Sequence, residues 1–394
     1  MLTERITRMT PSATCELEGT VAELEAAGVH VVGLNAGEPD FDTPENIQEA
    51  CFKAIREGKT KYIALAGLIE LRRAICKKLK DDNGVDYEPN QIVVSTGAKQ
   101  ALYNSVMAVA NPGDEVIIPY PCWVSYVEMV KLAEATPVLV KKKDDYQLDI
   151  EAIEKAITPK TKAIIINTPN NPTGAVYSKE SLLALGELAV RHDLFVISDE
   201  VYEKLIYDDA KHYCLASFSE EIKNHCIIIN GFSKAYAMTG WRIGYSASPA
   251  DLARGMASLQ GHTTSNSSTP IQWAALEALC GQQDTIEYMR QKFDERRIYL
   301  YKRLCAMPGI RCNRADGAFY LMPDVSAYYG KSTGAYTIRD SVDFCKYMLD
   351  EAHLAIVPGA AFESPNTVRI AYSNSLENIA AGMDQMEAAL ARLH

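Results

Sequence analysis

Residues 163–174 read Ala-Ile-Ile-Ile-Asn-Thr-Pro-Asn-Asn-Pro-Thr-Gly, an apolar run that ends in a loop rich in proline and asparagine. The four consecutive apolar residues, Ala163 to Ile166, predict a strand buried on both faces, because a half-exposed strand would alternate apolar and polar side chains. Strands of this kind belong to mainly parallel sheets with helices on both faces. The fold class expected from this stretch is therefore α/β.

Similar apolar runs occur on both sides of this stretch. The predicted strands are residues 91–95, 115–119, 137–141, 163–167, 194–198, 226–230 and 243–248. Helix-length segments separate them, and residues 178–192, which begin with serine and repeat leucine, have a helical pattern. We therefore predict a large domain with a mainly parallel seven-stranded sheet covered by helices on both faces.

After Pro270 the pattern changes to a long helical region that reaches about Met307. Beyond it, the expected strands are residues 317–322, 354–357 and 367–372, and the expected helices are residues 340–352 and 375–392. These elements predict a smaller α+β domain, onto which the N-terminal segment is expected to pack. The predicted divisions are residues 1–45 for that segment, 46–290 for the large domain and 291–394 for the small domain.

The composition excludes several classes of protein. Forty Lys and Arg residues against 51 Asp and Glu residues give a net charge of −11, which argues against general binding to nucleic acid or anionic membranes. No apolar run approaches the roughly 18 residues of a spanning helix, and residues 1–10 lack the apolar core of a secretory signal. The ten cysteines show no Cys-x-x-Cys pair, so neither a metal site nor disulfides are expected. A cytoplasmic location is the resulting expectation.

The residues that follow each strand are the first place to look for a ligand site, because open parallel sheets bind ligands beyond the carboxyl ends of their strands. These positions offer backbone donors, an aromatic ring, an amide, a carboxylate, a phenol and an amine. They are Gly97, Ala98, Lys99, Trp123, Asn171, Asp199, Tyr202, Ser233 and Lys234.

Several of these residues also have a structural interpretation. Gly97 opens a predicted helix and suits a phosphate, but it can also be a plain helix cap. Asp199 can hold a protonated nitrogen or cap a helix. Asn171 precedes a proline, so it displays an amide from a loop or simply makes a turn. Trp123 can stack on a planar ring or lie in the core.

The most specific stretch is residues 231–244, Gly-Phe-Ser-Lys-Ala-Tyr-Ala-Met-Thr-Gly-Trp-Arg-Ile-Gly. An amine that acts as nucleophile or base needs a pKa lowered by burial or by a neighbouring cation, and Arg242 lies eight residues after Lys234. This stretch and the order of the residues above resemble the class I aminotransferases, which are fold type I pyridoxal-phosphate enzymes. The resemblance spans nearly the whole chain.

The resemblance implies a role for each of these residues. Lys234 would bind the pyridoxal phosphate covalently and then move the catalytic proton, while Asp199 would pair with the ring nitrogen. The other implied cofactor contacts are Gly97, Ala98, Lys99 and Arg242 at the phosphate, Ser233 beside the lysine, Tyr202 and Asn171 at the phenolic oxygen, and Trp123 on the ring. Tyr62 matches a tyrosine that reaches a phosphate across a dimer interface, which implies a homodimer with a shared active site.

The substrate contacts come from the same resemblance. Arg369, in Thr-Val-Arg-Ile-Ala-Tyr-Ser at residues 367–373, matches the arginine that binds the substrate α-carboxylate, as its planar guanidinium allows. Gly37 lies in the N-terminal segment that closes over that carboxylate, and Trp123 and Asn171 are expected to contact substrate as well.

The identity of the amino acid depends on a second cation. One branch of the family binds a distal carboxylate with an arginine in a segment like residues 261–269, which contain none here. The bacterial aspartate aminotransferase branch, which this chain resembles more closely, has a lysine at the position of Lys99. L-Aspartate and 2-oxoglutarate are therefore the expected substrates, although Lys99 can instead support the phosphate or face solvent.

Other activities stay open at this point. They are transamination of aromatic amino acids or alanine, β-elimination from cystathionine, and ligand sensing without catalysis on the same fold. Some members of the branch also use prephenate, and in them a basic residue can precede the Pro-Ser-Ala-Thr run. Thr10 holds that position before residues 11–14, so prephenate activity is not expected.

Overall fold

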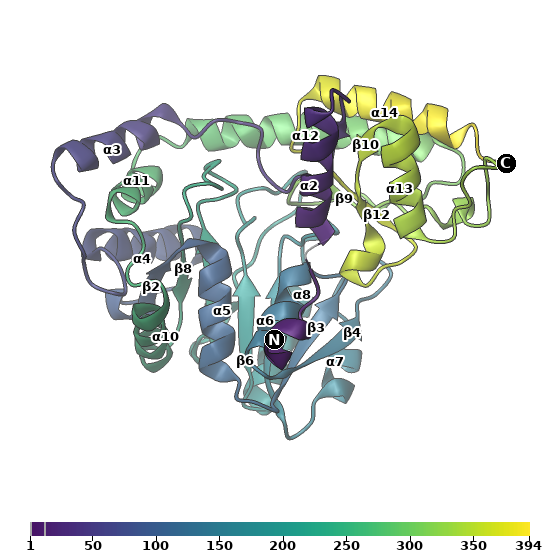
Figure 1. The fold of residues 1–394 in the computed structure, drawn as a ribbon. Helices are drawn as coiled ribbons and strands as arrows, with labels where there is room; N and C mark the ends of the chain where they lie inside the picture. The colour runs from purple at the N-terminus through teal and green to yellow at the C-terminus, as the bar shows by residue number, and fades with distance from the viewer. Residues whose placement is uncertain (1, 12) are drawn as a thin grey trace.

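The computed structural model describes residues 2–11 and 13–394 as an α/β protein built on a seven-stranded sheet (Figure 1). The strands are β2 Ile92–Ser95, β3 Glu115–Tyr120, β4 Thr136–Lys141, β5 Thr161–Asn167, β6 Phe195–Asp199, β7 Cys226–Gly231 and β8 Gly244–Ala247. Their order is β2-β8-β7-β6-β5-β3-β4; β8 runs antiparallel to β2 and β7, and the other neighbouring pairs are parallel. The predicted fold class and the seven predicted strands are confirmed.

Helices cover both faces of this sheet. On one face lie α5 Gly97–Val109, α6 Val124–Leu132 and α10 Ala250–Thr263. On the other lie α3 Glu45–Arg56, α4 Ile69–Asn83, α7 Ile150–Ala156, α8 Lys179–Arg191, α9 Glu220–Asn224 and α11 Thr269–Cys280. Ala163 and Ile165 belong to the first core and Ile164 and Ile166 to the second, which is why four consecutive positions of β5 are apolar.

Local signals set the ends of these helices. The Ser178 hydroxyl accepts a hydrogen bond from the Ser181 amide at 3.1 Å, so α8 begins where its serine cap was predicted. Gly84 ends α4 with φ +69°, a conformation that glycine adopts without strain. Among the described residues, no helix is both long and apolar enough to cross a membrane.

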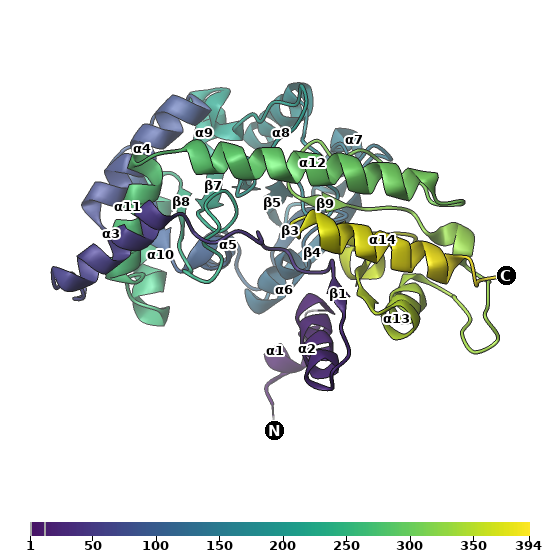
Figure 2. The same ribbon diagram turned by 90° about the horizontal axis from the view of Figure 1, so that it is seen from above.

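A single long helix connects the sheet to a second, smaller unit. Helix α12 Asp284–Ala306 is about 34 Å long at 1.5 Å per residue, and Figure 2 shows it running above the molecule toward α14. Near its start Ile286 packs with the core on the α4 and α8 face of the sheet, whereas Met289, Phe293 and Leu300 pack in the core of the small unit. The small unit also contains β9 Tyr320–Leu321, α13 Ser341–Ala352, β10 Leu354–Ala355, β11 Val357–Pro358, β12 Val368–Ala371 and α14 Leu376–Leu390. Short 3-10 helices occupy residues Pro89–Gln91, Leu215–Ser217, Ser326–Tyr328 and Gly359–Phe362.

The C-terminal elements differ in detail from the prediction. The expected strand at 317–322 shrinks to β9, and the one at 354–357 splits into β10, which pairs with β1 Val32–Gly33, and β11, which pairs with β12. The helical region after Pro270 is interrupted between α11 and α12. There the side-chain Nε2 of Gln283 donates to the carbonyls of Ala278 and Gly281, both at 2.9 Å, and so satisfies carbonyl groups at the end of α11.

The N-terminal segment packs on the small unit, as expected. It contains α1 Glu4–Thr7, α2 Ala13–Ala26 and β1, and β1 runs parallel to β10. Val31 packs with Leu349 and Ala355, next to apolar side chains of α2. The division of the chain at residues 45 and 290 stays a prediction.

Candidate active site

A cavity of about 620 Å³ lies beyond the carboxyl ends of β5, β6 and β7, where the sheet meets the small unit. The predicted site residues that line it are Gly37, Ala98, Lys99, Trp123, Asn171, Asp199, Tyr202, Ser233, Lys234, Arg242 and Arg369. Gly97 lies directly behind Arg242. Tyr62 is 88% exposed and lies outside this cavity.

Lys234 places an amine in the centre of the cavity. It follows β7, and its Nζ donates to the Gly37 carbonyl at 2.6 Å. Burial, together with the charges of Arg369 and Arg242, lowers the pKa of Lys234 to about 8, against the opposing effect of Glu38 and Asp199. An amine with this pKa is partly unprotonated near neutral pH, as a nucleophile or a base must be.

Asp199 provides a buried carboxyl group opposite this amine. Its Oδ2 accepts from the Tyr126 hydroxyl at 2.7 Å, and its Oδ1 accepts from the Val201 amide at 3.3 Å. Burial raises the pKa of Asp199 to about 6, although Tyr126, Val201 and Lys234 act in the other direction. Residues 201–204 form turns, so the helix-cap interpretation of Asp199 is wrong. A buried carboxyl of this kind is suited to a cationic ring nitrogen, which would restore its charge.

The start of α5 is a candidate anion-binding site, because free backbone amides and the helix dipole favour negative charge there. Gly97 has φ +81°, and a Cβ there would lie 2.6 Å from Arg242 Nη2. A Cβ on Gly244 would overlap the backbone of Ala98. The two glycines therefore let the guanidinium and the helix start approach each other closely. Arg242 itself is anchored by a 2.7 Å bond from its Nη1 to the Thr239 carbonyl.

Arg369 is a buried guanidinium on β12, the central strand of the small three-stranded sheet. Its Nη1 donates to Asn171 Oδ1 at 3.1 Å and its Nη2 to the Asn35 carbonyl at 2.6 Å. Its Nε has no hydrogen-bond partner in the described part of the chain, and no carboxylate there forms a salt bridge with it. A buried, uncompensated guanidinium beside a cavity is suited to an incoming carboxylate.

Lys99 and Trp123 line the cavity from the large domain, Lys99 in α5 and Trp123 directly before α6. Lys99 Nζ is 4.9 Å from the centroid of the Trp123 ring, a cation–π distance. Trp123 packs edge-on against Tyr126, with centroids 5.4 Å apart, and it is partly buried. Its ring packs against the core on the α5 and α6 face of the sheet and also lines the cavity, so the two interpretations of Trp123 are compatible.

Two tyrosines of the site were missed from the sequence. Tyr126 holds the Asp199 carboxyl, and the Tyr320 hydroxyl lies 2.8 Å from that of Tyr202. Tyr126 falls three residues after Trp123, a helical spacing that could have drawn attention to it. Tyr320 lies on a two-residue strand and reaches the site only through tertiary packing, so no local pattern marks it.

The N-terminal segment also contributes groups that the sequence did not single out. Asn35 offers its backbone carbonyl to Arg369. Glu38 accepts from the Thr239 hydroxyl at 2.8 Å, and Glu18 of α2 lines the outer part of the cavity.

The donor set fits pyridoxal phosphate group by group. An amine faces the cavity for an aldehyde, a buried carboxyl can face a ring nitrogen, and phenol and amide groups can face a phenolic oxygen. The glycine-lined cradle at the start of α5, with Arg242 beside it, suits the phosphate. These matches use the chemistry of the side chains alone.

Comparisons with known proteins identify the family of this chain. Residues 29–385 match the family model of aminotransferase class I and II. The chain is 45% identical to an aspartate aminotransferase of Bacillus sp. strain YM-2, over 98% of both chains. It is also 45% identical to a probable aspartate/prephenate aminotransferase of Aquifex aeolicus, over 99% of this chain and 98% of that one.

Solved structures give the same result for the fold. The aspartate aminotransferase of Thermus thermophilus with maleate superposes with a TM-score of 0.93 at 41% identity, covering 99% of each chain. That of Rhizobium meliloti gives 0.96 at 40% identity over the whole of both chains. The chain therefore belongs to the class I and II aminotransferase family and is a pyridoxal-phosphate-dependent aminotransferase.

Proposed function

We propose that this enzyme transfers the amino group of L-aspartate to 2-oxoglutarate, giving oxaloacetate and L-glutamate by a ping-pong mechanism. The observation that carries the proposal is that Lys99 and Arg369 line one cavity together with Lys234. Two cations can bind the two carboxylates of a dicarboxylic amino acid, and a monocarboxylic amino acid would use only one of them. The names of the relatives support the same substrate.

Pyridoxal phosphate, when bound, accepts the amino group of the donor, passes it to the acceptor, and takes up the electrons of the substrate Cα–H bond. Lys234 would attach it covalently and Asp199 would keep its ring nitrogen protonated. The phosphate would be held by Gly97, Ala98, Ser233 and Arg242, the phenolic oxygen by Tyr202 and Asn171, and the ring face by Trp123.

The protein groups then have three tasks. Lys234 Nζ, with its pKa lowered to about 8, can remove the proton from the substrate α-carbon and return it. Arg369 binds the α-carboxylate and fixes the orientation of the Cα–H bond. Lys99 binds the distal carboxylate from the large domain.

The Lys99 assignment is tested by Lys99→Met, which removes the charge and keeps an unbranched chain of similar length. We expect kcat/KM for L-aspartate to fall at least about tenfold, equivalent to about 1.4 kcal/mol, while kcat/KM for L-alanine changes little. Lys162→Met, at an exposed position near the start of β5, is the matched control. An equal loss for both amino acids would assign Lys99 to the phosphate instead.

Prephenate is a second candidate substrate, because relatives named for both aspartate and prephenate match at 44–45% identity. Thr10 stands where a basic residue would be expected, and its amide donates to Glu128 at 3.2 Å. We expect prephenate to be a poor acceptor, which a comparison of kcat/KM for prephenate and 2-oxoglutarate would test.

We also propose that the active enzyme is a homodimer in the cytoplasm. Tyr62 is 88% exposed, and exposed apolar side chains surround it in the sequence: Phe52, Ile55, Leu65 and Ile69. Such side chains favour burial against a second subunit.

The nine cysteines whose bonding is described are all free, which suits a reducing compartment.

A further inference from the structure

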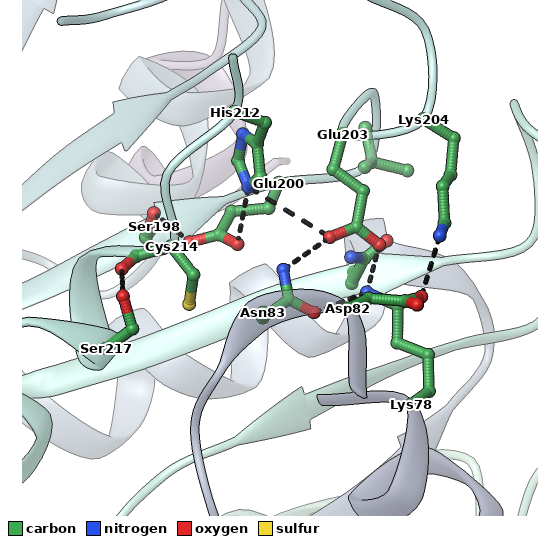
Figure 3. Close-up of polar contacts among 12 residues, drawn as sticks. Lys78, Asp82, Asn83, Ser198, Glu200, Glu203, Lys204, His212, Cys214 and Ser217 are labelled. Carbon is green, nitrogen blue, oxygen red and sulfur yellow. Dashed lines mark hydrogen bonds and ion pairs between the residues drawn. The ribbon is translucent and has the colours of Figure 1, made fainter. Parts of the chain in front are cut away.

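A buried network of charged side chains lies directly behind the segment that carries Asp199 and Tyr202. Residues 199–203 read Asp-Glu-Val-Tyr-Glu, and all five are buried. Asp199, Val201 and Tyr202 line the cavity, whereas Glu200 and Glu203 do not line it and instead contact polar side chains of α4 and of the loop that carries His212 (Figure 3). Glu200 and Glu203 are therefore the immediate chain neighbours of Asp199 and Tyr202, the two residues expected at the cofactor ring.

The glutamates meet partners from two other parts of the chain. Glu203 forms a salt bridge with Lys78, and its Oε2 accepts from Asn83 Nδ2 at 2.8 Å, both at the end of α4. Glu200 Oε2 lies 3.0 Å from His212 Nε2, which is also 4.0 Å from Glu203 Oε2. The network thus ties α4 and the loop after residue 208 to the turn that follows β6, as Figure 3 shows.

Within this network, Glu203 and Lys78 stabilise each other's charged form. Burial opposes ionisation of Glu203, yet Lys78, His212 and Asn83 bring the pKa of Glu203 down to about 2. Burial also acts against the charge of Lys78, but Glu203 raises the pKa of this ammonium. The ligand atoms of Glu200, Glu203 and His212 lie within 4.8 Å of one another, a spacing that would suit a metal ion, but the Lys78 ammonium already supplies a cation there.

The network also borders the loop that carries the catalytic lysine. A small cavity of about 10 Å³ is lined by Lys78 and Glu203 on one side and by Gly231, Phe232 and Ala235 on the other. Displacement of Glu203 would therefore be transmitted to both Asp199 and the surroundings of Lys234, because packed interiors transmit strain.

We propose that the Lys78–Glu203–His212–Glu200 network positions Asp199 for contact with the cofactor ring nitrogen, so that these residues determine cofactor affinity without touching the cofactor. The inference rests on the proposed role of Asp199. Because a hydrogen bond between a carboxylate and a protonated ring nitrogen depends steeply on distance and angle, a small shift of the turn would weaken the contact. Glu203 and Lys78 are thus positioning residues and not catalytic ones.

The test is a double-mutant cycle read as the dissociation constant for pyridoxal phosphate. The full-length chain is freed of cofactor and titrated with pyridoxal phosphate, and binding is followed by its visible absorption. We expect Glu203→Gln to weaken binding about tenfold in the wild-type background and less than about twofold in the Asp199→Asn background. A purely structural role would give the same factor in both backgrounds and would overturn the inference.

Two further variants keep the outcome clear. Lys204→Met removes a neighbouring, half-exposed salt bridge to Asp82, and it should leave the affinity unchanged. If Glu203→Gln does not fold, Lys78→Met combined with Glu203→Met replaces the pair with apolar side chains, an exchange that buried ion pairs often tolerate. This double variant should still lose affinity about tenfold.

The proposed function and the inference fail in different ways. If Asp199→Asn alone leaves the affinity unchanged, the nitrogen contact itself is wrong and the inference falls with it. If Asp199→Asn weakens binding but the Glu203→Gln factor stays constant or is absent, only the positioning role is wrong.

Discussion

At the scale of single residues, the site contains groups whose pKa values are moved toward neutrality from both sides. Burial brings the Lys234 amine down to about 8 and the Asp199 carboxyl up to about 6. Burial therefore disfavours the charged form of each group in the cofactor-free protein. The cofactor carries an aldehyde that can react with the amine and a ring nitrogen that can pair with the carboxylate. The burial of these two groups lowers the stability of the cofactor-free protein and prepares the site to bind the cofactor.

The burial of Asp199 predicts that the free energy of unfolding of the cofactor-free protein depends on pH. Between about pH 4 and pH 6 the carboxyl loses its proton in the unfolded chain but keeps it in the folded one. Stability from this group is therefore full at low pH and falls by up to about 3 kcal/mol as the pH rises. Asp199→Asn removes this dependence, so the difference in unfolding free energy between variant and wild type should grow by about 2 kcal/mol from pH 4 to pH 7.

Urea unfolding of both proteins at several pH values measures this difference, because titrations elsewhere in the chain cancel between them. A difference that stays constant with pH would mean that Asp199 ionises normally in the free protein. Saturating pyridoxal phosphate should abolish the effect, since a cationic ring nitrogen would stabilise the carboxylate.

The sequence predicted the placement of residues that follow strands but not of those that depend on tertiary packing. Lys234 and Asn171 follow β7 and β5, and Asp199 is the last residue of β6, so strand prediction alone brings them to one rim. Tyr320 enters the site from the small unit and Asn35 from the N-terminal segment, and no local pattern specifies either position.

At the scale of elements, the start of α5 combines a helix dipole, a glycine with positive φ and a guanidinium in contact with it. Gly97→Ala would add two separate costs, the left-handed conformation and the overlap with Arg242 Nη2. We expect a loss of about 1 kcal/mol in stability from the conformation, and at least a tenfold weaker affinity for pyridoxal phosphate from the displaced guanidinium.

Gly113→Ala is the matched control for this prediction. Gly113 has φ +86°, but a Cβ there would meet nothing within 4 Å. This variant should lose a similar amount of stability in thermal unfolding and keep the wild-type affinity. If both variants bind the cofactor equally well, the contact between Gly97 and Arg242 does not shape the candidate anion-binding site.

The same scale shows where element prediction works and where it fails. Strands of four to seven residues in the large sheet have enough apolar positions to be predicted from the chain alone. Residues 354–358 instead contain two strands of two residues each: β10 pairs with β1, and β11 pairs with β12. A two-residue strand has no periodicity, so its pairing partners determine it.

At the scale of the whole molecule, the cavity is assembled from three distant parts of the chain. The large sheet supplies Lys234 and Asp199, the small unit supplies Arg369 and Tyr320, and the N-terminal segment supplies Asn35 and Gly37. The hydrogen bond from Arg369 to the Asn35 carbonyl joins the last two parts. Tyr62 is exposed and lies outside this assembly, and the proposed second subunit would bring it in.

A shared site makes a specific prediction about mixed dimers. Lys234→Ala and Tyr62→Ala homodimers should each be impaired, because every site lacks one of the two residues. In a hybrid of the two chains, one site lacks both residues and the other is intact. After subunit exchange in an equal mixture, about one quarter of all sites should be intact and aspartate aminotransferase activity should rise to about that fraction of wild type. Activity that stays at the average of the two separate variants would place Tyr62 and Lys234 in the same chain's site, or leave Tyr62 without a role in it.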